Sequence, residues 1–159
     1  YYPTEFKDWP AIQYWIVGAA TAILMFASVL LHELGHSLVS LYYKIPVRSI
    51  TLFIFGGVAR VEAEPPSAIV EMWIAIAGPA VSFALAIFFG LLQSIVGTIA
   101  PLLALVKYLF YINGVLALFN LIPGFPLDGG RIFRAFVWRV THNLRRATLI
   151  AASLGRFIA

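Results

Sequence analysis

Long apolar segments alternate with short polar ones along this chain of 159 residues. The first apolar segment covers residues 11–43, the second covers 68–92, and the third lies within 98–127. At a rise of about 1.5 Å per residue, roughly 20 helical residues cross the hydrocarbon of a bilayer. The pattern therefore predicts three membrane-spanning helices, of which the first is long or tilted.

Glycine and proline interrupt two of these segments. Gly78-Pro79 falls inside the second, where a bilayer helix tolerates a break if its neighbours satisfy the freed carbonyl. The third segment is too long for one straight helix, and we expect it to begin near Pro101 and to end early, at "NLIPGFPLDGG". Residues 145–159, "RRATLIAASLGRFIA", resemble the opening of a fourth span.

The polar segment between the first two spans has the composition of strands. Residues 44–66, "KIPVRSITLFIFGGVARVEAEPP", are rich in Val, Ile, Phe and Thr, with Gly56-Gly57 at the middle. This favours a β-hairpin or small sheet over an ordinary loop at the membrane interface. The predicted fold is thus a membrane-embedded helical bundle of three spans and the start of a fourth, with a small β element between the first two.

Composition supports the membrane assignment. Apolar residues make up 62% of the chain and charged residues 11%, and the mean hydropathy is +0.93. A soluble domain carries roughly a quarter charged residues, so we expect an integral, multi-pass membrane protein in contact with lipid. The chain has no cysteine, which excludes disulfides and thiolate metal sites. We interpret residues 1–159 as a single core domain and as a fragment of a longer protein.

The net charge of +4 is concentrated in one segment. Five arginines lie within residues 131–146. Such a cluster beside an apolar segment is typical of a cytoplasmic membrane flank, so we do not expect a nucleic-acid partner. This orientation also makes 44–67 cytoplasmic and the turn at 93–98 external.

The motif "HELGH", residues 32–36, lies near the end of the first span. His32 and His36 fall on one helix face, a turn apart, which is the spacing that presents two imidazoles to one zinc ion. Glu33 is offset around the helix, where the H-E-x-x-H pattern uses it as the general base of a metalloprotease. The alternative is a buried polar cluster satisfied by neighbouring helices. Ionisable groups at membrane depth favour a functional site.

A catalytic zinc ion needs a third protein ligand. Asp128 is the best candidate, because prolines and glycines keep "LIPGFPLDGG" from forming a regular helix. Such backbone at membrane depth must be buried in protein or line a wet cavity. Asp128 could instead be a helix N-cap. The other candidates are Glu62, Glu64, Glu71 and His142.

Three motifs together resemble the site-2 protease family of intramembrane zinc metalloproteases. They are "HELGH" at the inner end of a span, "AGPAVSF" in the next, and "FNLIPGFPLDGGR" after the third. The resemblance implies that His32, His36 and Asp128 ligate one Zn²⁺ and that Glu33 activates water. It also implies that Asn120 acts near the substrate carbonyl or holds it.

The same resemblance implies the partners. The expected substrate is a transmembrane segment of another protein, cleaved in regulated intramembrane proteolysis, and a regulatory domain or partner would lie outside this sequence. Counting back from Tyr43, the site lies roughly 10 to 15 Å from the cytoplasmic surface. Two other functions fit a membrane protein with these residues: a metal-ion transporter, which needs ligands repeated along a path, and a catalytically silent binding protein of the same fold.

Overall fold

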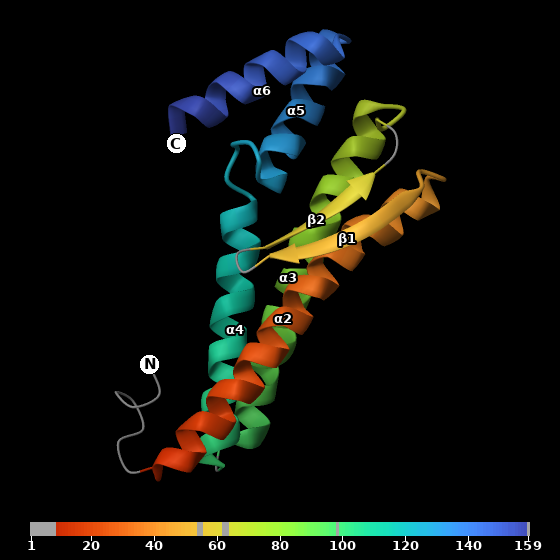
Figure 1. Cartoon of the computed structure of the whole chain (residues 1–159). Helices are drawn as coiled ribbons and strands as arrows, with labels where there is room; N and C mark the ends of the chain where they lie inside the picture. The colour runs from red at the N-terminus through yellow and green to blue at the C-terminus, as the bar shows by residue number, and fades with distance from the viewer. Residues whose placement is uncertain (1–8, 54–55, 62–63, 98, 159) are drawn as a thin grey trace.

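A computed structural model describes residues 9–53, 56–61, 64–97 and 99–158. Its elements follow in the order α2 (Ala11–Tyr42), β1 (Val47–Phe53), β2 (Gly56–Val61), α3 (Ala68–Val96), α4 (Ala100–Asn120), α5 (Asp128–Thr141) and α6 (Leu144–Ile158). The helices α2, α3 and α4 run side by side, while the hairpin, α5 and α6 gather toward one end (Figure 1).

The helices begin where the sequence offers start signals. Pro10 precedes α2 in an extended conformation, and Pro101 lies in the first turn of α4, where its missing N–H costs no hydrogen bond. Ser67 caps α3, because its hydroxyl accepts a hydrogen bond from the Val70 amide. At the C-terminal end of α5, His142 takes a left-handed conformation and ends the helix.

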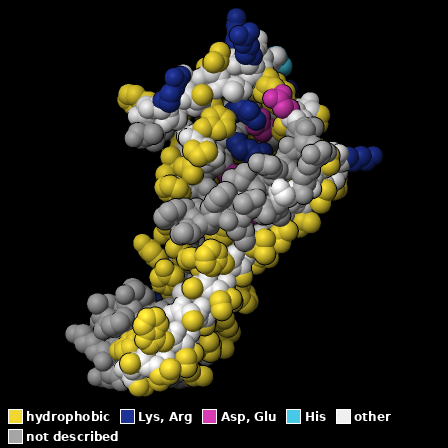
Figure 2. Space-filling view, viewed as in Figure 1, with side chains coloured by type: hydrophobic (Ala, Val, Ile, Leu, Met, Phe, Trp, Pro, Cys, Tyr) yellow, Lys and Arg dark blue, Asp and Glu magenta, His cyan; other side chains and the backbone are white. Residues whose placement is uncertain are grey.

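Within the residue ranges that the structure describes, three helices are long and apolar enough to cross a bilayer, namely α2, α3 and α4. This confirms the prediction of three apolar spans. Much of their apolar surface is exposed, for example 78% of Trp15 and 77% of Ile95, as expected for side chains that face lipid. Figure 2 shows hydrophobic side chains over the long helices, whereas most of the Lys and Arg side chains in view lie at the end of the molecule where α5 and α6 are.

The prediction for residues 145–159 needs correction. The described part of the chain holds no fourth membrane-spanning helix there. Instead α6 has 15 residues, about 22 Å of helix, and it carries Arg145, Arg146 and Arg156. Helix α6 crosses the direction of the long helices in Figure 1. The apolar residues of this segment suggested a span, but they share one amphipathic helix with its arginines.

The predicted β element also needs correction. Strands β1 and β2 pair antiparallel, and Phe53 pairs with Gly56. Gly56-Gly57 therefore begins β2. The position of these glycines at the middle of residues 44–66 had instead suggested a turn. The connection, residues 54–55, lies outside the described residues.

Small residues let the helices approach closely. Ala75, Ala104 and Ala117 are completely buried between helices. At Gly35 of α2, an added Cβ would lie 3.0 Å from the carbonyl oxygen of Ala77 in α3. Close backbone approach of this kind is how membrane helices associate without a hydrophobic driving force. It brings the second half of α2 against the first half of α3.

Candidate metal centre

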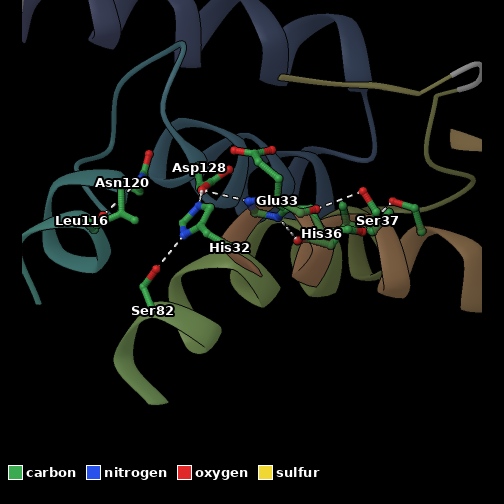
Figure 3. A network of polar contacts seen from close by, with 10 residues as sticks. His32, Glu33, His36, Ser37, Ser82, Leu116, Asn120 and Asp128 are labelled. Carbon is green, nitrogen blue, oxygen red and sulfur yellow. Dashed lines mark hydrogen bonds and ion pairs between the residues drawn. The ribbon is translucent and has the colours of Figure 1, made fainter. Parts of the chain in front are cut away.

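Two histidines of α2 and an aspartate of α5 meet between the helices (Figure 3). His32 and His36 lie a turn apart and are 2% and 5% exposed. Nε2 of each ring lies 3.1 Å from Oδ2 of Asp128. Among the residues that the structure describes, these three form a group whose potential ligand atoms all lie within 4.8 Å of one another.

The segment between α4 and α5 brings Asp128 to the histidines. Asp128 is the first residue of α5 and is 9% exposed. Gly129 and Gly130 follow it and pack directly on that segment: an added Cβ at Gly130 would lie 2.6 Å from the carbonyl carbon of Gly124, and one at Gly129 would overlap the Leu121 carbonyl. The glycines therefore allow α5 to begin close enough to α2 for the carboxylate to reach both rings.

Helix α3 orients both imidazoles from the other side. Nδ1 of His36 donates to the Ile74 carbonyl at 2.6 Å, and Nδ1 of His32 lies 2.8 Å from the Ser82 hydroxyl. Metal-ligating histidines typically make such a hydrogen bond through their second nitrogen. Neither partner was predicted from the sequence, although Ser82 belongs to the "AGPAVSF" motif.

The arrangement fits a bound cation. When the His36 ring is neutral, its proton is on Nδ1, so Nε2 and the Asp128 carboxylate present two lone pairs to each other at 3.1 Å. Only a proton or a metal cation between them removes this repulsion. The glycine of "AGP" leaves space beside them, because an added Cβ at Gly78 would lie 2.6 Å from Nε2 of His32 and would overlap the His36 ring.

Glu33 follows His32 on α2 and is 8% exposed. Its side chain rises from α2 on the side where Asp128 lies (Figure 3). The offset of one residue keeps this carboxylate out of the group formed by the two rings and Asp128. It is therefore a polar neighbour of the group rather than a member of it.

The other candidates from the sequence lie apart from the group. Glu64 and His142 are exposed. Glu71 is completely buried and forms an ion pair with Arg134 of α5. Glu62 lies outside the described residues. Of the five acidic and histidine candidates named for the third position, the structure brings only Asp128 to the two histidines among those that it describes.

Asn120 is the last residue of α4, just before the segment that leads to Asp128. Its side chain is half-buried, and Nδ2 donates to the Leu116 carbonyl at 3.0 Å. Figure 3 shows it in the same close-up as the histidines. The amide is therefore held by its own helix and keeps a second N–H for another acceptor.

Comparison with known proteins agrees with this geometry. The family model described as Peptidase family M50 matches residues 20–98 and 94–159. The chain belongs to peptidase family M50. The Synechocystis sp. (strain ATCC 27184 / PCC 6803 / Kazusa) protein sll0528, provisionally described as a zinc metalloprotease, is 52% identical over 146 residues, which cover 89% of this chain and 38% of that protein. The zinc metalloprotease MJ0392 of Methanocaldococcus jannaschii is 40% identical over 144 residues, which cover 91% of this chain and 42% of that protein.

A solved structure also resembles this M50 chain. The site-2 protease from Methanocaldococcus jannaschii superposes with a TM-score of 0.67 at 38% identity, over 86% of this chain and 62% of that one. The resemblance to the site-2 protease family is thereby confirmed. The chain spans about two fifths of the length of the curated relatives, 38% and 42% for the two above.

Proposed function

We propose that this protein is an intramembrane zinc metalloprotease that hydrolyses peptide bonds within or near transmembrane segments of other membrane proteins. The observation that carries the proposal is the buried group of two histidines and an aspartate on α2 and α5, beside a buried glutamate. Membership of an M50 peptidase family and the zinc metalloprotease relatives support it. Residues 1–159 would be the core domain that carries this chemistry.

In this proposal His32, His36 and Asp128 hold the zinc ion. Two imidazoles and a carboxylate make up a donor set that is common in catalytic zinc sites, which keep a further position open. When bound, zinc supplies a Lewis acid that polarises a carbonyl and makes a water molecule acidic near neutral pH. Ser82 and the Ile74 carbonyl keep the imidazoles in the orientation that this requires.

Glu33 is the proposed general base. Its carboxylate accepts the proton of the attacking water and then passes it to the leaving amine. The role fits a side chain that is next to His32 in the sequence, is buried, and is not part of the three-residue group. Asn120 would support the substrate by donating its second amide N–H to the carbonyl of the bond that is cleaved.

The proposed substrate approaches within the bilayer, and water enters from the cytoplasmic side. His36 lies six residues before the end of α2, about 9 Å of helix. The arginine-rich segment is at the same end of the molecule as the hairpin, which supports a cytoplasmic position for this end (Figure 1). Cleavage there would suit regulated intramembrane proteolysis, with regulatory parts contributed from outside this sequence.

A metal-ion transporter is less well supported, because the described residues offer one such group and not a series along a path. A silent binding protein of the same fold differs from a protease only in lacking turnover. The decisive experiment therefore measures zinc content and cleavage of a model transmembrane peptide on the same detergent-purified preparations.

Glu33→Gln separates chemistry from architecture. It preserves size and hydrogen-bonding shape but cannot accept a proton at neutral pH, so cleavage should fall at least about a hundredfold while zinc content stays near wild type. His36→Ala should lose zinc and cleavage together, and Glu64→Gln, which changes an exposed carboxylate, should alter neither. A near-normal rate in Glu33→Gln would refute the assigned mechanism, and loss of its zinc would make Glu33 a ligand.

A further inference from the structure

An ion pair between a buried carboxylate and a half-buried guanidinium joins α3 to α5 outside the three-residue group. Glu71 in the first turn of α3 is completely buried. Its Oε1 accepts from Nε of Arg134 at 2.7 Å, and a second guanidinium nitrogen of Arg134 donates to the same oxygen. Within the part of the chain that is described, Oε2 of Glu71 is buried without a hydrogen-bond partner. The pair therefore depends on one oxygen and on the placement of one guanidinium.

Arg134 makes a second contact, to the segment that leads into Asp128. Its guanidinium carbon lies 5.7 Å from the centroid of the Phe125 ring, within range of a cation–π interaction. The Phe125 backbone is also packed against α6, because an added Cβ at Gly155 would lie 2.9 Å from its nitrogen. One guanidinium thus contacts α3 and the α4–α5 segment from its position on α5.

The pair lies one to two helical turns from both halves of the metal centre. Glu71 precedes Ile74 by three residues on α3, so it is about one helical turn from the carbonyl that holds His36. Arg134 follows Asp128 by six residues on α5, less than two turns from the carboxylate. The contact therefore ties the helix that orients the imidazoles to the helix that supplies the aspartate.

We propose that Glu71 and Arg134 are positioning residues that hold Asp128 within reach of His32 and His36. The inference deepens the proposed function and rests on it only in taking zinc as the metal. The segment before Asp128 contains two prolines and one glycine and has no helical ladder to fix the start of α5. A planar guanidinium that donates twice to one carboxylate supplies the missing constraint, because it fixes direction as well as distance.

A purely structural role explains the pair less well. This ion pair takes Glu71 completely, and Arg134 largely, out of water, and well-packed apolar residues of similar volume are often as stable. If the contact served only to hold α3 against α5, leucine and methionine at positions 71 and 134 would be sufficient. A directional contact one to two turns from the metal ligands also fixes the position of the Asp128 carboxylate. Apolar packing does not fix that position.

The test measures the zinc dissociation constant by competition with a chelator, without reference to cleavage. Arg134→Gln and Glu71→Gln should each weaken zinc binding by about ten- to a hundredfold, the range found when outer-shell partners of metal ligands are removed. Arg134→Lys, which keeps the charge but loses the planar fork, should recover part of the affinity. The visible spectrum of bound Co²⁺ should change in the two glutamine variants, because the geometry of the donor set changes.

Two controls separate positioning from general stability. Arg139→Gln removes an exposed charge from the same helix, and Leu109→Ala destabilises a fully buried site in α4; both should bind zinc like wild type. The double variant Glu71→Leu/Arg134→Met replaces the ion pair by apolar side chains. It should fold, and its zinc affinity should stay as low as that of the single variants. Wild-type zinc affinity in that folded double variant, or in both single variants, would overturn the inference. Absence of zinc binding by the wild-type protein would instead refute the proposed function.

Discussion

Replacing Gly78 by alanine tests whether the space beside the two imidazoles belongs to the metal centre. The added Cβ would lie 2.6 Å from Nε2 of His32 and would overlap the His36 ring, whereas ordinary van der Waals contact begins at 3.4 Å. The His32 nitrogen would therefore have to move by about 0.8 Å. Zinc–nitrogen bonds are about 2.0 to 2.1 Å long and tolerate deviations of about 0.2 Å.

The His32 nitrogen would move by about four times that tolerance. This should weaken zinc binding more than the loss of an outer-shell partner does, and such a loss weakens metal binding about ten- to a hundredfold. We therefore expect Gly78→Ala to weaken zinc binding by at least about a hundredfold, or about 2.8 kcal/mol. Zinc is measured by atomic absorption after dialysis against a chelator of known affinity, and folding is followed by thermal unfolding in detergent.

Gly114→Ala is the matched control for this substitution. Gly114 lies in α4, and an added Cβ there would meet nothing within 4 Å. Alanine is the better helix former by about 0.5 to 1 kcal/mol, so this variant should be at least as stable as wild type and should bind zinc normally. Wild-type zinc affinity in a folded Gly78→Ala protein would refute the placement of the metal between the two rings and Asp128.

Two further predictions concern the third ligand and the orientation. Asp128→Ala should abolish zinc binding and cleavage, whereas Glu64→Ala should preserve both; full zinc content in folded Asp128→Ala would assign the ligand elsewhere. In this cysteine-free chain, Glu64→Cys and Ser94→Cys introduce single exposed thiols at the two ends of α3. An impermeant thiol reagent should label them from opposite sides of sealed vesicles, and labelling of both from one side would contradict the proposed orientation.

Local sequence patterns were sufficient for features that depend on one segment at a time. The lengths of the apolar segments predicted α2, α3 and α4, because bilayer thickness fixes the length of a spanning helix. The four-residue spacing of His32 and His36 predicted that both rings would share a face, since helical periodicity alone determines this. Local patterns failed for residues 145–159, where apolar content resembled a span but arginines on the same helix give it an amphipathic character.

Contacts between distant segments needed the tertiary structure. The sequence offered several acidic residues as partners of His32 and His36, and only packing brings Asp128 to 3.1 Å from both while Glu71 turns to Arg134. Ser82 and the Ile74 carbonyl could not be assigned from their own residue types, because serines and carbonyls are common and their roles depend on which helix faces them. Periodicity and hydropathy are properties of one segment and can be determined from the sequence. The approach of α5 to α2 depends instead on glycines that leave space and on side chains that meet only after the helices pack.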